Sequence, residues 1–245
     1  MKPYNRKQLM KVFSRAAGKP ELSGGDFLDA ILRERPDLKG KTAYAPQQGA
    51  FAYTLVFENE VFKAPRRPWH IRNMKKYVRE FDREADVLQA LEGKGLPVPR
   101  VTCRGRHAVF YGMTRIKGAP LESLYDKLSQ DELQTLAGQV ADFVVAMARK
   151  LPRSKDGLYA MQGDLKEANI LINPKTKKLT GIVDFGLTCY VTKDDLTARW
   201  TRNLPFREII NAALAEKKSV LPDSPPTVKS RYAPSDPYLH AGPDW

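Results

Sequence analysis

The sequence predicts an α+β fold in which a small antiparallel sheet comes first and a mainly helical part follows. Three observations carry this prediction. Residues 43–116 alternate between short β-patterned runs and one strongly amphipathic helical run. Residues 117–218 are mostly helical in pattern. The chain has 245 residues, of which 42% are apolar, enough to bury the core of one large domain or two small ones.

Apolar periodicity and turn residues predict the elements in chain order. In the first part we expect a short strand within 43–49, a hairpin from 52–57 and 61–64, a helix over 73–91, and strands at 100–104 and 108–113. In the second part we expect a long helix over 130–150, a strand pair at 170–172 and 181–183, and a last helix over 205–216.

Two flanking segments lie outside this pattern. Residues 1–42 carry two short amphipathic helical patterns, which either pack on the adjoining domain or dock on a membrane or a partner. Residues 219–245 hold six prolines among 27 residues and are expected to be extended or irregular. The predicted order is therefore a helical extension at 1–42, a sheet lobe at 43–116, a helical lobe at 117–218 and a Pro-rich tail at 219–245.

The composition indicates which partners and which cellular compartment to expect. The chain carries 41 Lys and Arg against 28 Asp and Glu, a formal charge of +13 that favours anionic partners. Its two cysteines, Cys103 and Cys189, are too few for a disulfide framework. No apolar run reaches the ~18 residues of a membrane-spanning helix, and no signal peptide is visible. We therefore expect a cytoplasmic protein without a transmembrane segment.

The positive charge is concentrated in residues 63–79. This segment holds seven Lys and Arg and no acid, with Trp69, His70 and Tyr77 interleaved. Such a composition can contact a phosphate backbone and stack on bases. The segment therefore either serves ATP and solubility or binds an anionic partner, either RNA or a glycolipid.

The sharpest signal is a pair of motifs that follow each other in the helical part. Residues 162–171 read QGDLKEANIL, and residues 182–186 read IVDFG. Together they resemble the catalytic loop and metal-binding turn of the protein-kinase-like superfamily. The GDLxxxNIL form is similar to aminoglycoside and choline phosphotransferases and to small atypical kinases, namely the KEOPS kinase subunit, RIO kinases and lipopolysaccharide kinases. The resemblance implies a bilobal kinase-like fold with a small antiparallel β-sheet N-lobe and a reduced, mainly helical C-lobe.

The resemblance assigns roles to residues of both motifs. Phosphoryl transfer needs a group that orients the acceptor hydroxyl and oxygen ligands that hold Mg²⁺ against the phosphates. Asp164 corresponds to the catalytic base, and Asn169 and Asp184 to the metal ligands. Lys166, two residues after the base, could stabilise the transferring phosphoryl group. The Asp-Leu-Lys order resembles Ser/Thr protein kinases more than small-molecule enzymes.

A kinase-like fold also needs a strand lysine for the ATP phosphates and a helical glutamate that orients it. Lys63 ends the second strand of the hairpin. At about 100° per residue, Glu84 falls at the apolar face of helix 73–91, whereas Glu80 falls outside it. Because an acid at an apolar face is costly unless it is paired, we expect Glu84 to pair with Lys63.

The resemblance implies roles for three further sets of residues, and at two of them this chain differs from the usual pattern of the superfamily. Gln48 and Gly49 stand where a glycine-rich loop would cover the phosphates, but only one glycine is present. Thr114 and Ile116 are the candidates for contacts with adenine. Gln162 replaces the usual histidine, whose bracing hydrogen bonds an amide can imitate.

The sequence therefore predicts an ATP- and Mg²⁺-dependent kinase that transfers the γ-phosphate to an acceptor hydroxyl. A protein serine or threonine is the leading acceptor, because of Lys166 and because the helical lobe is short. A small-molecule or glycolipid kinase is the enzymatic alternative, and an RNA- or partner-binding module on a kinase fold is the non-enzymatic one. The sequence contains no HExxH or GxSxG motif and no Cys/His metal set.

Overall fold

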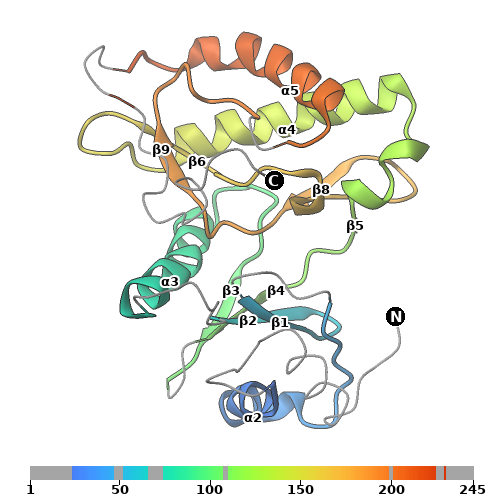
Figure 1. Cartoon of the computed structure of the whole chain (residues 1–245), viewed down its shortest axis with the longest axis vertical. Coiled ribbons are helices and arrows are strands. Elements are labelled where there is room, and N and C mark those ends of the chain that lie inside the picture. The colour runs from blue at the N-terminus through green and yellow to red at the C-terminus, as the bar shows by residue number, and fades with distance from the viewer. Residues whose placement is uncertain are drawn as a thin grey trace. The chain divides into compact units, whose positions relative to one another are not determined.

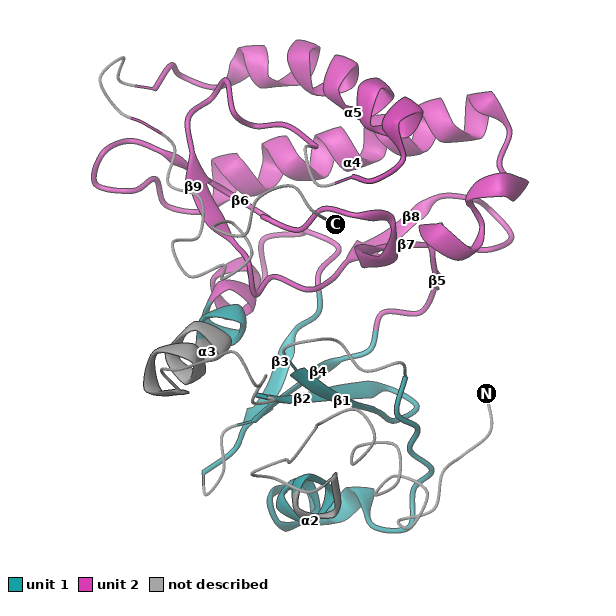
Figure 2. Ribbon diagram, viewed as in Figure 1, with its two compact units in different colours: residues 1–86, 99–115 teal, residues 87–98, 116–245 magenta. Residues whose placement is uncertain are grey.

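A computed structural model of the chain describes residues 24–46, 52–65, 74–106, 110–198, 201–224 and 229, with only the backbone for residues 24–26 and 74–82. The chain divides into two compact units (Figure 2). Unit 1 comprises residues 1–86 and 99–115, and unit 2 comprises residues 87–98 and 116–245. No helix among the described residues is long and apolar enough to cross a membrane.

Unit 1 is built on a four-stranded antiparallel sheet with the strand order β1-β2-β4-β3. Its strands are β1 (Ala52–Val56), β2 (Glu60–Pro65), β3 (Val101–Arg104) and β4 (Tyr111–Thr114). The predicted hairpin and the two later strands are thus confirmed. Of the short strand expected upstream within 43–49, the described residues 43–46 form one bridge, between Tyr44 and Val56, and residues 47–49 lie outside the described ranges.

Helix α2 (Gly24–Glu34) supplies the core of unit 1 together with the sheet. Its residues Phe27 and Ile31, one turn apart, are at most 1% exposed. The ring of Phe27 meets that of Phe110 edge-on at 6.1 Å. A short 3-10 helix, η1 (Pro36–Leu38), follows, where Pro36 prevents the α-helix from continuing.

Helix α3 (Met74–Leu91) joins the two units in sequence, since unit 2 begins at Val87. Over its described part, Ala85, Leu88 and Leu91 are at most 1% exposed, as the predicted apolar face requires. Asp86, on the exposed side, pairs with Arg104 of β3 at 2.5 Å.

Unit 2 is centred on helices α4 (Gln130–Lys150) and α5 (Leu204–Lys217), which pack along each other (Figure 1). A capping box starts α4: Ser129 Oγ accepts the Glu132 N–H, and the Glu132 carboxylate accepts the Ser129 N–H. The buried stripe of α4 includes Leu136, Val140 and Val144, as its apolar periodicity predicts.

Two small sheets complete unit 2. One has the strand order β5-β7-β8, from β5 (Ala119–Pro120), β7 (Ile170–Ile172) and β8 (Leu179–Ile182). The other pairs β6 (Tyr159–Met161) with β9 (Cys189–Val191). Short 3-10 helices lie at η2 (Leu121–Ser123), η3 (Tyr125–Lys127), η4 (Glu167–Asn169) and η5 (Lys218–Val220). The sequence analysis did not predict the β6–β9 ladder, in which β6 leads directly into the first motif and β9 follows the second.

Candidate active site

The predicted catalytic loop runs from the end of β6 into η4, and its centre is the carboxylate of Asp164. Lys166 Nζ lies 2.6 Å from Asp164 Oδ2, and Asn169 Nδ2 donates to the same oxygen at 3.0 Å. Asn169 Nδ2 also donates to the Asp164 carbonyl at 2.7 Å. Both donors therefore engage Oδ2, and no hydrogen bond to Oδ1 is found within the described part of the chain.

Burial raises the pKa of the Asp164 carboxyl above its usual value, and the negative charge of Asp184 acts in the same direction. The hydrogen bond and charge of Lys166, with the Asn169 hydrogen bond, oppose this rise. The carboxylate is therefore more basic than an exposed aspartate while staying hydrogen-bonded in a fixed orientation. Such an environment suits a group that accepts a proton during a reaction.

Asp184 is brought to the loop by a backbone hydrogen bond, since the N–H of Val183 donates to the Asn169 carbonyl at 3.0 Å. Asp184 has a φ of 66°, a left-handed conformation that is uncommon for residues other than glycine. Such strained backbone is often found at functional sites. The predicted metal ligands thus lie on two chain segments that are hydrogen-bonded next to each other.

The donor set of Asn169 and Asp184 fits Mg²⁺. Since the Asn169 amide nitrogen is used at Asp164, its side-chain oxygen remains as an acceptor, and the Asp184 carboxylate is the second candidate oxygen ligand. Within the described ranges, no group of three or more His, Cys, Asp or Glu side chains could hold a metal ion. A cation here would depend on few protein ligands, with phosphate and water for the rest, as is usual for Mg²⁺.

Gln162 connects the two motifs from a buried position. Its side-chain oxygen accepts the Asp164 N–H at 2.9 Å, while Nε2 donates to the carbonyls of Asp184 at 2.8 Å and Val183 at 3.3 Å. The residue is only 2% exposed. The bracing expected of an amide in place of histidine is therefore present in the structure.

Gly163 allows the two motifs to approach closely. A Cβ at this residue would lie 2.0 Å from the Leu187 carbonyl oxygen, in the segment between Asp184 and β9. No side chain fits there, because the obstructing atom belongs to the backbone. The pairing of Met161 with Cys189 at the end of the β6–β9 ladder sets this contact.

The predicted pair of Lys63 and Glu84 is present in unit 1. Lys63 Nζ lies 3.0 and 3.1 Å from the two carboxylate oxygens of Glu84. Glu84 is 3% exposed, and the Lys63 side chain is 12% exposed. Lys63 stands in β2, and Glu84 in α3, so the pair fixes the ammonium group relative to the sheet.

The structure describes two of the four other predicted nucleotide-binding positions, Thr114 and Ile116. Thr114 uses its N–H and its hydroxyl within the sheet, both with the backbone of Arg100. Ile116 packs against Gly181, where its Cδ1 would lie 2.4 Å from an added Cβ. Gln48 and Gly49 lie outside the described residues. The roles of all four in nucleotide binding remain predictions.

The basic segment 63–79 is only partly described. Its residues 66–73 lie outside the described ranges, as do the side chains of residues 74–79. Its anionic partner therefore remains a prediction.

The sequence analysis missed two residues that join the catalytic loop to the N-terminal end of α5. Glu167, 7% exposed, accepts the backbone N–H groups of Arg202 and Asn203. Thr201, 1% exposed, donates its hydroxyl to the Leu165 carbonyl at 2.8 Å. No local pattern signals these contacts, because the partners are more than thirty residues apart.

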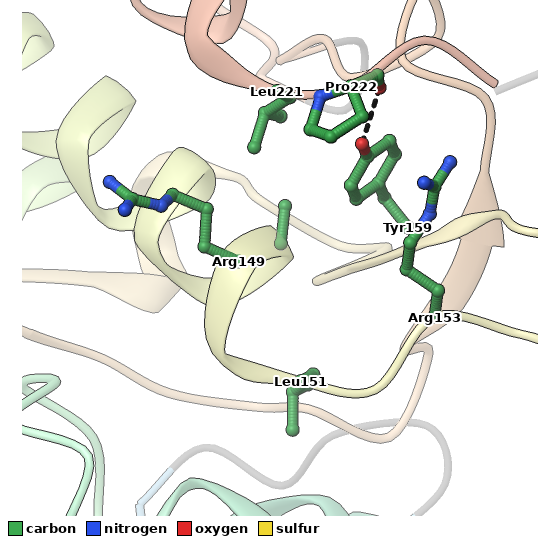
Figure 3. Close-up of a pocket in the computed structure, with 7 residues that line it drawn as sticks. Arg149, Leu151, Arg153, Tyr159, Leu221 and Pro222 are labelled. Atoms are coloured by element: carbon green, nitrogen blue, oxygen red, sulfur yellow. Dashed lines mark hydrogen bonds between the residues drawn. The ribbon is translucent and has the colours of Figure 1, made fainter.

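A separate pocket of about 240 Å³ lies in unit 2 (Figure 3). It is lined by residues of the last turn of α4, the segment that follows it, β6 and the first residues of the Pro-rich tail, namely Ala148, Arg149, Leu151, Arg153, Tyr159, Leu221 and Pro222. None of the predicted site residues lines it.

Comparison with known proteins identifies the fold. A model of the phosphotransferase enzyme family (APH) matches residues 62–158, a segment that includes Lys63 and Glu84. The GDP complex of wild-type aminoglycoside 2′-phosphotransferase-IIIa is similar to the chain with a TM-score of 0.62 at 16% identity, covering 78% of this chain and 85% of that one. The chain has a protein-kinase-like fold. The predicted resemblance to aminoglycoside phosphotransferases is thereby confirmed.

Two further solved structures agree with this result. The ternary complex of streptomycin, ATP and APH(2″)-IIa matches with a TM-score of 0.58 at 15% identity, covering 78% of this chain and 81% of that one. Aminoglycoside phosphotransferase APH(3″)-Id from Streptomyces rimosus matches with a TM-score of 0.56 at 15% identity, covering 80% and 92%. No curated protein matches the chain.

Proposed function

We propose that the chain is an ATP- and Mg²⁺-dependent phosphotransferase that moves the γ-phosphate of ATP to an acceptor hydroxyl. The observation that carries this proposal is the hydrogen-bonded cluster of Asp164, Lys166 and Asn169, joined to the Asp184 turn through Gln162. The matching family model and the kinase-like neighbours support the same reaction class.

The proposed base is Asp164, acting through Oδ1. Because Lys166 and Asn169 both bind Oδ2, Oδ1 is the atom left to accept the proton of the acceptor hydroxyl. The hydroxyl oxygen forms the new bond to the γ-phosphorus while the bond to the ADP oxygen breaks, and the proton passes to Asp164. Lys166, held beside the base, can stabilise the negative charge of the transferring phosphoryl group.

The remaining roles concern the nucleotide. Asn169 and Asp184 would hold the metal ion, which when bound neutralises phosphate charge and orients the leaving group. Lys63 would bind the α- and β-phosphates, with Glu84 holding its ammonium group in position. The ion pair fixes the Lys63 side chain before the nucleotide arrives, so less side-chain entropy is lost on binding.

For the acceptor, we propose a small hydroxyl compound in preference to a protein serine or threonine. Solved structures with the same fold hold small aminoglycosides, among them streptomycin in a complex with ATP. No comparison supports a protein acceptor. Lys166, which favoured a protein acceptor in the sequence, is paired with Asp164, a role that does not depend on the kind of acceptor.

The test is a labelled-ATP assay with Mg²⁺ against aminoglycosides, simple sugars, a glycolipid, RNA and a generic protein. We expect labelling of a small acceptor by the wild-type chain. Asp164→Asn and Asp184→Asn should each lose on the order of 10²-fold or more in rate, because each removes a carboxylate from the reacting centre. Lys63→Met should raise the Kd for Mg-ATP about tenfold or more, since it removes a buried cation from the phosphates.

Two matched controls separate chemistry from general damage. Asp194→Asn removes an exposed carboxylate of unit 2, and Asp86→Asn removes an exposed one of α3 near Glu84. Both should behave as wild type. Equal labelling by the wild type and the Asp184 variant would contradict the proposal, whereas labelling of the protein alone would restore the protein acceptor.

A further inference from the structure

The segment Thr201–Asn203, which leads into α5, is fixed to the catalytic loop by a buried carboxylate. Glu167 Oε1 accepts the Asn203 N–H at 2.7 Å, and Oε2 accepts the Arg202 N–H at 3.2 Å. Both oxygens are therefore occupied by backbone donors, and the residue is 7% exposed. A carboxylate bound in this way holds two chain segments together and is not free to take part in proton transfer.

A second contact acts on the peptide between the base and Lys166. Thr201 Oγ1 donates to the Leu165 carbonyl at 2.8 Å, and Thr201 is 1% exposed. Leu165 lies between Asp164 and Lys166, so its carbonyl belongs to the short stretch that carries both charged groups. The loop is thus held at Leu165 and again at Glu167.

The other side of this connection is itself rigid. Asn203 caps α5, since its side-chain oxygen accepts the Phe206 N–H at 3.1 Å and the Tyr125 hydroxyl at 2.8 Å. Phe206 is fully buried and meets the Tyr125 ring edge-on at 5.9 Å. The segment that Glu167 and Thr201 hold is therefore anchored in the packed body of unit 2.

We propose that Glu167 and Thr201 are positioning residues for phosphoryl transfer, an inference that rests on the proposed function. They transmit the fixed position of α5 to the Asp164–Lys166 stretch and so maintain the geometry of the base and its lysine. Small displacements of reacting groups cost large factors in rate, up to about 10²-fold for about 1 Å. Lys63, the proposed phosphate ligand, is held separately by Glu84 in unit 1, so loss of these two contacts should act mainly on kcat.

The test compares isosteric and conservative variants of each residue. Thr201→Val keeps the shape but removes the donor, whereas Thr201→Ser keeps the hydroxyl. Glu167→Gln keeps an oxygen for one N–H and places an NH₂ group against the other. Glu208→Gln, an exposed change on the same helix, is the matched control. For each protein, kcat and the KM for ATP are measured with the acceptor found for the wild type, together with hydrogen exchange of the catalytic-loop amides.

We expect Thr201→Val and Glu167→Gln to lower kcat on the order of tenfold, with the KM for ATP within about twofold of wild type. Exchange at the loop amides, including that of Asn169, should accelerate in both variants. Thr201→Ser and Glu208→Gln should restore or keep the wild-type values. A purely structural role would lower the thermal midpoint without this split between kcat and KM.

Three outcomes overturn the inference. An active wild type with unchanged kcat and exchange in Thr201→Val and Glu167→Gln would overturn it and leave the proposed function standing. Equal loss in Thr201→Ser and Thr201→Val would also overturn it, because the hydroxyl would then not be the group that matters. A folded wild type that transfers phosphate to no acceptor would overturn the proposed function and this inference with it.

Discussion

At the residue scale, one uncharged side chain connects Asp164, the proposed base, with the turn at Asp184, a proposed metal ligand. Gln162 uses its amide in both directions, as an acceptor toward Asp164 and as a donor toward Asp184 and Val183. An ionisable residue here would change these bonds with pH, whereas an amide keeps both at every pH. The structure thus explains how this chain retains the bracing contact without the usual histidine.

Substitutions of Gln162 should show how much its donated hydrogen bonds, as distinct from its accepted one, contribute to stability. Gln162→Glu keeps the acceptor but sets a buried carboxylate against two carbonyl oxygens, so we expect a loss of about 2–4 kcal/mol in the free energy of unfolding. Gln162→His offers one donor and one acceptor and should stay within about 1 kcal/mol of wild type. Chemical denaturation measures both. A Glu variant as stable as wild type would contradict the assigned hydrogen bonds.

At the element scale, the β6–β9 ladder sets the distance between the motifs. Gly163 lies just past the end of β6, where its Cα faces the Leu187 carbonyl. Gly163→Ala should therefore destabilise the chain by about 1–3 kcal/mol, because backbone atoms must move apart to admit a methyl group. The same displacement should lower phosphotransfer activity.

Gly138, in the middle of α4, provides the matched control for this change. An added Cβ there meets no atom within 4 Å. Gly138→Ala should raise the free energy of unfolding by about 0.5–1 kcal/mol, since alanine favours the helix. Thermal or chemical denaturation of the two variants compares them directly. Destabilisation of equal size in both would show that close approach at Gly163 is not the cause.

The elements also show which features a sequence can predict. The long helices and the first hairpin were predicted because their apolar residues repeat over many positions. Glu84 was identified as the partner of Lys63 by its place on the helix face. Strands β5, β6 and β9 were not predicted, because each has only two or three residues and, unlike β7, no partner strand close by in the sequence. They form only through pairing with distant segments.

The same limit applies within the site. Asp164, Asn169 and Asp184 were predicted because their two motifs, 162–171 and 182–186, resemble those of the protein-kinase-like superfamily. Glu167 was part of the first motif but carried no assigned role. Its partners, Arg202 and Asn203, come together with it only when α5 packs in unit 2. Tertiary contacts of this kind leave no periodic or spaced signal in a single sequence.

At the scale of the whole molecule, the first residues of the Pro-rich tail belong to unit 2. Leu221 is 3% exposed, and the Tyr159 hydroxyl donates to the Pro222 carbonyl (Figure 3). Lys193 binds the tail twice, with its ammonium group 2.9 Å from Asp223 and its N–H 2.9 Å from Ser224 Oγ. The first residues of the predicted irregular tail, up to Ser224, are therefore part of unit 2, because they are held against β6 and the segment after β9.

Two truncated chains, one ending at Ser224 and one ending at Lys218, test whether residues 219–224 stabilise unit 2. We expect the first to keep the stability of the full chain. The second loses the burial of Leu221, worth about 1.5–3 kcal/mol, together with the hydrogen bonds of Pro222 and Ser224. The pair of Lys193 and Asp223 adds little, because the Asp223 side chain is 90% exposed. The shorter chain should therefore unfold at a lower temperature.

Tyr159 belongs to the β6–β9 ladder and Lys193 follows it, and β6 runs into the catalytic loop while β9 follows the Asp184 turn, so this loss should also reach the site. Hydrogen exchange of the β6 and β9 amides should accelerate in the chain ending at Lys218 and not in the one ending at Ser224. Asp223→Asn in the full chain is the control and should leave both readouts unchanged within about 0.5 kcal/mol. Equal unfolding temperatures and equal exchange in the two truncated chains would show that residues 219–224 do not stabilise unit 2.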